Sequence, residues 1–482
     1  MATRPASNLW RVKPIDRIMK QSGNKEQGLK RTLTAFSITL LGIGAIVGTG
    51  IFVLTGVAAA KYAGPGLILS FIAAGIASGL AAICYAEFAS TVPIAGSAYT
   101  YSYATLGELV AWIIGWDLIL EYAVGAAAVS IGWSGYIVDL LKSSLGIVIP
   151  KALATSPFSG GIINLPAFLI ILVLTALLIL GTSESTRVNN IIVIVKLAVI
   201  VFFLIVGFGH VNPANWNPFL PYGPGGIFRG ASIIFFAYIG FDQISTSAEE
   251  AKNPSRDMPL GIFLSLLVCT ILYIAVTAVL TGMVSYKQLD VASPVSHALI
   301  LVGLNAAGSV ISFGAVCGLT TVLIVLLYGQ SRIFFSMARD GLMPRLFSRI
   351  HPRFHTPYAS SILIGIFVAL VAGLTPIDVV AELTNIGTLT AFVLVSAAVL
   401  ILRRTQPDLR RGYRVPFVPV VPILSVLASV VLIVSLPLVT LLRFVIWLLI
   451  GLAVYFLYSR HHSRLDHDDA DVADEEVIPD AS

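Results

Sequence analysis

Apolar stretches recur along the whole chain, with short polar segments between them. Most contain roughly 20 residues, enough to cross about 30 Å of hydrocarbon as an α-helix. Segments of about ten residues that alternate between polar and apolar positions, as in outer-membrane barrels, are absent. We therefore predict an all-α membrane protein with twelve transmembrane helices, at about 33–57, 66–90, 107–140, 163–181, 188–209, 227–248, 259–283, 305–337, 357–374, 379–401, 416–438 and 440–459.

Composition supports this prediction, because 57% of the 482 residues are hydrophobic and only 11% are charged. A soluble protein with so few charges could not keep its apolar surface out of water, so the bilayer must be the main solvent. The first apolar stretch is too long for a signal peptide and follows a basic leader at residues 1–31 without an evident cleavage site. We expect it to remain in the mature protein.

The distribution of basic residues predicts the orientation. If both termini face the cytoplasm, 23 of the 30 Lys and Arg lie on the cytoplasmic side, 6 lie outside, and Lys196 lies within a span. Such a bias is the positive-inside signature of a multi-pass protein in a cell (plasma or inner) membrane. The net charge of +5 then needs no nucleic-acid partner, because the charges lie at the membrane surface.

The spans also divide the chain. We predict a basic cytoplasmic segment at 1–31, a first five-helix repeat at 32–209, a second at 210–402, two further helices within 403–460, and an acidic, disordered tail at 461–482. Cys84, Cys269 and Cys317 lie on separate apolar helices, so neither a disulfide nor a zinc site is expected. Histidines and acids near the start of the tail form a weak metal-chelating pattern, but a solvated acidic tail is the favoured interpretation.

Two spans contain residues that disfavour an unbroken helix. In the first, Gly42, Gly44, Gly48 and Gly50 fall within nine residues, and each destabilises a helix by roughly 1 kcal/mol relative to Ala. A broken helix is tolerated at membrane depth only where its backbone lines a cavity or is buried in protein. The alternative is a small-residue packing face, since Gly44-x-x-x-Gly48 fits the close-crossing motif. A nucleotide-binding glycine loop is excluded, because the third glycine is one place late.

The sixth span has a similar interruption, where Gly240 and Asp242 follow a run of aromatic residues. An acidic residue in mid-span is costly unless it faces a polar interior. Spans one and six are equivalent positions in two five-helix repeats, and paired interruptions point to the binding site of an inverted-repeat transporter. We therefore favour a five-plus-five inverted repeat with discontinuous helices 1 and 6, plus two C-terminal helices, over the packing alternative.

The two breaks together predict a ligand. Freed N–H groups of Gly48, Thr49 and Gly50 start the second half-helix, whose positive dipole end attracts a carboxylate. Freed carbonyls of Ile46, and of Phe236 and Ile239 in span six, accept hydrogen bonds from an ammonium group. A site with amides on one side and carbonyls on the other suits an α-amino acid zwitterion. The bulky Phe236 side chain is a candidate gate over the ligand.

Charged residues inside the spans add candidates for coupling and specificity. Lys196 in span five either snorkels to the nearby interface or alternates between charged and neutral forms, because burial disfavours the charged amine. Asp117 and Glu121 share one face of span three at i and i+4, and the deeper Glu121 is placed to meet a cationic ligand side chain. Glu87 lies near a helix end, where an interfacial position is the simpler interpretation.

Several blocks of sequence resemble the amino acid–polyamine–organocation superfamily, and within it the cationic amino acid transporter branch, as a bacterial member. The resemblance covers roughly residues 25–460 and is carried by the following blocks: GIGAIVGTGIFV at 42–53, YAEFASTVPIAGSAYTY at 85–101, GWDLILEY at 115–122, FFAYIGFDQISTSAEE at 235–250, NPSRDMP at 253–259 and YGQSRIFFSMARDGLMP at 328–344. It implies an inverted-repeat fold, a substrate held at the breaks in helices 1 and 6, and a lysine on helix 5, here Lys196, in place of a sodium site.

One departure from the family pattern concerns the substrate. Span eight is bulky beside the expected site, at Val322, Val325 and Leu326, so a long side chain such as that of arginine would fit poorly. Small neutral amino acids such as alanine then become as plausible as cationic ones such as arginine or lysine. The predicted substrate site comprises Ile43, Gly44, Ile46, Gly48, Thr49, Gly50, Glu121, Phe236, Ala237, Ile239, Asp242 and Leu326.

The predicted function is therefore proton-coupled symport of L-amino acids by alternating access, with protons as the coupling ion, no metal and no other cofactor. We expect a monomer in contact with membrane lipid. An amino-acid exchanger or a nutrient receptor on the same fold stays open as an alternative. A transporter of the major facilitator type is disfavoured because 88–106 contains no Lys or Arg. We expect no enzymatic activity, since no metalloprotease, serine-hydrolase or Walker motif is present.

Overall fold

A computed structural model describes residues 11–12, 32–91, 97–181, 186–354 and 356–463. Within these ranges every regular element is a helix, and only two isolated β-bridges occur. The α-helices are α2 (Ala35–Ile46), α3 (Thr55–Ala58), α4 (Leu67–Thr91), α5 (Ser97–Thr105), α6 (Glu108–Leu145), α7 (Lys151–Ala154), α8 (Leu165–Leu180), α9 (Thr186–Phe208), α10 (Gly223–Ile234), α11 (Pro254–Met283), α12 (Pro294–Leu301), α13 (Asn305–Arg339), α14 (Tyr358–Leu374), α15 (Ile377–Thr405), α16 (Val420–Val434), α17 (Leu438–Val454) and α18 (Arg460–His462).

Among the described residues, eight helical stretches are long and apolar enough to cross a membrane. Four shorter apolar helices, α2, α8, α14 and α16, accompany them. Helices therefore occupy all twelve ranges predicted from the sequence, and the all-α, multi-span fold class is confirmed. The number of crossings and the repeat boundaries stay predictions.

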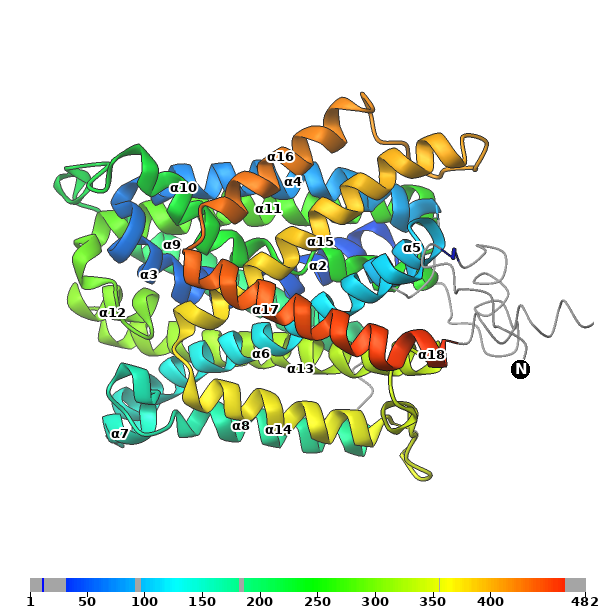
Figure 1. The fold of residues 1–482 in the computed structure, drawn as a ribbon. Coiled ribbons are helices and arrows are strands. Elements are labelled where there is room, and N and C mark those ends of the chain that lie inside the picture. Colours follow the sequence, from blue (N-terminus) through cyan, green and yellow to red (C-terminus); the bar gives the residue numbers. More distant parts are fainter. Residues whose placement is uncertain (1–10, 13–31, 92–96, 182–185, 355, 464–482) are drawn as a thin grey trace, which may run out of the picture.

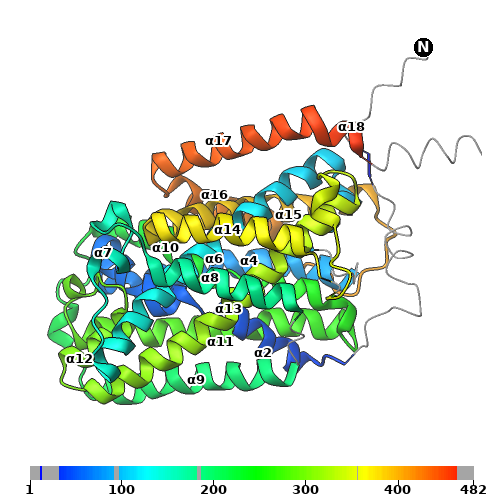
Figure 2. The same ribbon diagram turned by 90° about the horizontal axis from the view of Figure 1, so that it is seen from below.

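The helices form a bundle in which most run roughly along one direction (Figures 1 and 2). The long helices α6 and α13 pack against each other at its centre, and 78% of the apolar window of α6 is buried. The corresponding share is only 22% for Leu438–His462, and α17 within it runs along the outer edge of the bundle (Figure 2). The candidate residues Asp117 and Glu121 on α6 therefore lie at the centre of the bundle, whereas α17 presents its apolar face outward.

The described ends of the chain meet at Glu108, the first residue of α6. The Glu108 amide donates to the carbonyl of Arg11 at 2.9 Å. Its carboxylate accepts hydrogen bonds from the hydroxyl groups of Tyr103, Tyr455 and Ser463. The two ends therefore lie on the same side of the bundle. The rest of the predicted leader 1–31, and the predicted tail beyond Ser463, lie outside the described residues.

Glu87, near the end of α4, is buried in the protein, and its side chain is only 1% exposed. Its carboxylate accepts two hydrogen bonds from Arg403, at 3.0 and 2.7 Å, and one from the Val415 amide at 2.7 Å. The buried guanidinium of Arg411 lies 3.1 Å away. A buried charge is tolerated only when it is paired and hydrogen-bonded. Glu87 therefore attaches the segment between α15 and α16 to the end of α4.

Candidate substrate site

The first predicted span is interrupted at its glycine-rich centre. Helix α2 ends at Ile46, Val47 has an extended conformation with ψ of 98°, and a π-helical turn starts at Gly50. The last carbonyls of α2 and the first amides of the following turn thus lie on either side of Val47. Both sets lack helical partners and carry the partial charges of helix ends.

The second break follows α10. A 3₁₀ turn covers Phe235–Tyr238, Ile239 is extended, and Gly240 has a φ of 122°, a conformation that side chains disfavour. The Asp242 carboxylate accepts a hydrogen bond from the Gly240 amide at 3.1 Å. The carboxylate of Asp242 therefore stabilises the backbone of the second break, and this acid in mid-span has a hydrogen-bond partner.

The two breaks pack directly against each other. A Cβ atom at Gly50 would lie 2.3 Å from the Cα of Ala237, and one at Gly240 would lie 2.8 Å from the carbonyl carbon of Ala45. The hydroxyl group of Tyr273 on α11 lies 2.9 Å from the Ile46 carbonyl oxygen and 2.8 Å from that of Ala237. This tyrosine therefore joins both breaks.

A cavity of about 20 Å³ lies between the breaks and helices α6, α13 and α15. That space holds about one water molecule, so an amino acid could enter only after the walls move apart. Eight of the twelve predicted site residues line it: Ile46, Gly48, Thr49, Gly50, Glu121, Phe236, Ile239 and Leu326. The remaining lining residues are Ala45, Gly125, Val129, Gln243, Val322 and Thr384.

The other four predicted residues, Ile43, Gly44, Ala237 and Asp242, are not among the lining residues. The carbonyls of Ile43 and Gly44 accept hydrogen bonds from the Val47 amide and from Lys196. Ala237 packs on Gly50, and Asp242 binds the Gly240 amide. These four residues therefore belong to the two breaks but do not line the cavity themselves.

Some of the cavity-lining residues that were not predicted could have been found from the sequence. Gly125 and Val129 follow Glu121 at intervals of four residues, so helical periodicity places them on the same face of α6. Thr384 and Tyr273 carried no such signal, because α15 and α11 have no interruption beside them. Only the packing of these helices against the breaks reveals their positions.

Lys196 on α9 reaches the first break. Its side chain is buried, and its Nζ donates to the carbonyls of Gly44 at 2.9 Å and Val47 at 3.4 Å. A Cβ atom at Gly318 of α13 would lie 3.1 Å from the Lys196 Cε, so that glycine makes room for the aliphatic stem. The snorkelling interpretation is wrong, because the amine points into the bundle.

Two carboxyl groups on α6 are buried without full hydrogen bonding. Neither carboxylate oxygen of Asp117, nor Oε1 of Glu121, has a hydrogen-bond partner among the described residues. Asp117 lies one turn before Glu121 on the same helix face, and Glu121 borders the cavity. Such groups are suited to carry a proton or to bind a cation.

A match to a known protein family shows which family the chain belongs to. The family model described as amino acid permease matches residues 33–458, nearly the whole described chain. The chain belongs to the amino acid permease family. This match confirms the resemblance drawn from the sequence blocks.

Relatives of this permease are known in bacteria and plants. It is 53% identical to the methylthioribose transporter of Bacillus subtilis (strain 168) over 95% of its own length and 100% of the relative. It is also 53% identical to the branched-chain amino acid permease BcaP of the same organism, over 95% and 99% of the two chains. The vacuolar cationic amino acid transporter 4 of Arabidopsis thaliana is 38% identical over 83% and 68%. The permease is therefore a multi-pass membrane transporter and not an enzyme.

Proposed function

We propose that this permease imports L-α-amino acids together with protons. The observation that carries the proposal is the cavity between two packed helix breaks, with the helix-start amides at 48–50 beside the carbonyl of Ile46. The carboxylate of a zwitterion would bind those amides, where the helix dipole favours negative charge. Its ammonium would bind the carbonyls of Ile46, Phe236 and Ile239, since a carbonyl oxygen can accept two hydrogen bonds.

Lys196 would supply the coupling. In its charged form the ammonium donates hydrogen bonds to the carbonyls of Gly44 and Val47 and so holds α9 against the end of α2. Loss of the proton weakens both contacts and allows α2 to move relative to α9. Alternating access would then follow when the two five-helix repeats rock relative to each other around the breaks. We propose that the protein has twelve spans and that both of its termini lie in the cytoplasm.

Aliphatic side chains around the cavity favour neutral substrates. Val129, Val322 and Leu326 border the cavity, which leaves little room for a long polar chain. We propose neutral L-amino acids with small or branched side chains as the preferred class, and the name of the branched-chain relative supports it. Cationic amino acids are the second candidate, favoured by the free Oε1 atom of Glu121.

Uptake into proteoliposomes tests this proposal. With an inward proton gradient and no sodium, we expect saturable uptake of alanine and valine, collapse with a protonophore, and weaker uptake of arginine. Methylthioribose belongs in the same panel, because it has neither the carboxylate nor the ammonium that the site is proposed to bind. Transport of methylthioribose alone would contradict the proposal, and so would gradient-independent exchange of amino acids.

The variant Glu121→Gln separates the two substrate classes. Removing the carboxylate should lower arginine uptake more than valine uptake, because an unpaired buried guanidinium is costly. The ratio of the two initial rates measures the effect. An equal loss for both substrates would assign Glu121 to structure or proton handling instead of side-chain recognition.

A further inference from the structure

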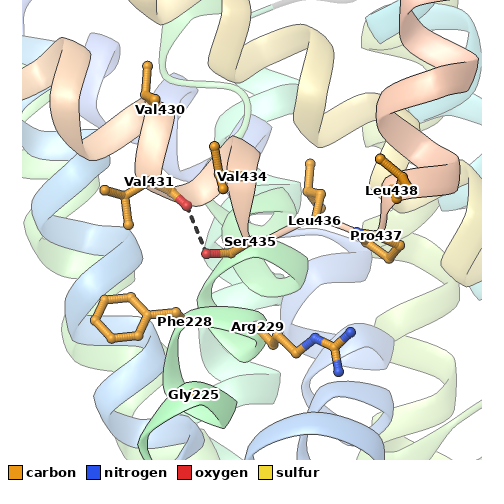
Figure 3. Close-up of a pocket in the computed structure, with 10 residues that line it drawn as sticks. All are labelled: Gly225, Phe228, Arg229, Val430, Val431, Val434, Ser435, Leu436, Pro437 and Leu438. Carbon is orange, nitrogen blue, oxygen red and sulfur yellow. Dashed lines mark hydrogen bonds between the residues drawn. The ribbon is translucent and has the colours of Figure 1, made fainter.

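A groove of about 630 Å³ lies at one end of the bundle, between the start of α10 and the turn that joins α16 to α17 (Figure 3). The basic-residue bias predicts that this end faces outside. The volume falls within the range of sites that bind small organic molecules, roughly 300–1,000 Å³. It is separate from the cavity between the helix breaks and shares no lining residue with it.

The walls of the groove are apolar and face outward. Phe228, Val431 and Val434 line it, and Val434 is 70% exposed. Apolar side chains along α16 and α17 are similarly exposed, from Val430 to Ile450. In a bilayer these faces contact the hydrocarbon chains of lipids. An occupant of the groove must therefore be largely apolar and must come from the membrane.

One cation defines the polar end of the groove. Arg229 is the only charged residue among those that line it, and its side chain is exposed. No carboxylate oxygen of the described residues lies within 4.0 Å of a nitrogen of its guanidinium group. In Figure 3, Phe228 and Arg229 leave α10 in opposite directions, with the guanidinium below Leu436 and Pro437. An apolar wall beside an exposed guanidinium matches an amphiphile with a negatively charged head.

Ser435 adds a second polar contact. Its hydroxyl donates to the Val431 carbonyl at 2.7 Å, which leaves the lone pairs of its oxygen available as acceptors. A head group that carries both a phosphate and hydroxyl groups could therefore bind Arg229 and Ser435 together. Guanidinium groups bind phosphates through two parallel hydrogen bonds, and each is stronger than a neutral hydrogen bond.

We propose that this groove binds an anionic glycerophospholipid, with the phosphate on Arg229 and an acyl chain along Phe228, Val431 and Val434. The lipid would attach α10 to the hairpin of α16 and α17. Helix α10 leads directly into the 3₁₀ turn at Phe235–Tyr238, beside the cavity. Lipid at its start would therefore stabilise one position of the second break. This inference goes beyond the proposed function and does not depend on the substrate.

Binding to the purified full-length protein tests the proposal. Dioleoylphosphatidylglycerol and dioleoylphosphatidylcholine have the same acyl chains and differ in head-group charge, and thermal stabilisation in detergent gives an affinity for each. We expect tighter binding of phosphatidylglycerol, and Arg229→Gln should weaken it about tenfold or more. Val431→Trp fills the groove without changing charge, so it should weaken both lipids. Inorganic phosphate should not stabilise the protein, because it has no acyl chain.

Arg443→Gln is the matched control. Arg443 is also exposed and, like Arg229, is electrostatically close to Glu382, but it does not line the groove. This variant should keep the preference for phosphatidylglycerol. Equal stabilisation by the two lipids, or an unchanged preference in Arg229→Gln, would overturn the proposal. A dimer of the unaltered protein that Val431→Trp converts to a monomer would also overturn it, because a second copy would then fill the groove.

Discussion

At the scale of single residues, the proposed substrate preference depends on side-chain volume around the cavity. Leu326 lines the cavity from α13, on the same wall as Val322 and across from α6. We predict that Leu326→Ala raises the ratio of arginine to alanine uptake by about tenfold or more, because one methylene group in an apolar pocket is worth roughly 1–3 kcal/mol. Competition for uptake measures this ratio. Ile324→Ala is the control, since Ile324 does not line the cavity, and an unchanged ratio in Leu326→Ala would contradict the prediction.

The glycines of the first break differ in what they tolerate. A Cβ atom at Gly48 would lie 3.6 Å from Val322 in ordinary contact, whereas one at Gly50 would overlap the backbone of Ala237. We predict that Gly48→Val keeps the melting temperature of the ligand-free protein but loses stabilisation by valine. Gly50→Ala should lower the melting temperature itself, so it is a poor test of binding. Full stabilisation of Gly48→Val by valine would count against the carboxylate site.

Residue type and depth were enough to find Lys196 and most of the cavity, because glycine runs and buried charges are conspicuous in apolar sequence. They did not show that Lys196 contacts the carbonyls of Gly44 and Val47, because that contact depends on how α9 packs against the first break. They did not reveal Tyr273 or Thr384, since an isolated polar residue in an uninterrupted helix looks the same on any face. The partner of Asp242 was also hidden, because a bond to the Gly240 amide depends on the backbone conformation of the break.

At the scale of elements, the segment between α15 and α16 is held by one acid. Removing the carboxylate of Glu87 would leave Arg403 and the buried Arg411 without their counter-ion. We predict that Glu87→Gln lowers the free energy of unfolding by about 3 kcal/mol, as expected for a broken buried ion pair. Thermal denaturation in detergent measures this loss. Arg404→Gln removes an exposed neighbouring charge and should change stability little, and comparable losses in the two variants would refute the ion-pair account.

The two helix breaks act as one element, because each glycine at the contact packs on the backbone of the other break. The sequence predicted both interruptions separately and paired them by their spacing of five spans. It could not predict that Gly50 meets Ala237 and Gly240 meets Ala45, since that contact joins positions nearly 200 residues apart. From this close contact we expect a larger residue at Gly50 to disturb folding as well as binding.

For the whole molecule, hydropathy predicted where the helices occur, because each apolar stretch must satisfy its backbone hydrogen bonds internally. It did not predict the central position of α6 and α13, or the meeting of the described chain ends at Glu108. Those features depend on contacts between distant segments. The family match confirms the transporter class, while proton coupling stays a proposal that is based on the position of Lys196.

The most direct test of the central claim is uptake of valine by Lys196→Met in proteoliposomes with an inward proton gradient. The account predicts that the unaltered permease accumulates valine above the external concentration without sodium. The Met variant should lose that accumulation while it keeps valine-dependent thermal stabilisation, because the cavity does not include Lys196. Normal proton-driven accumulation by the Met variant, or a sodium requirement in the unaltered protein, would contradict proton coupling through Lys196.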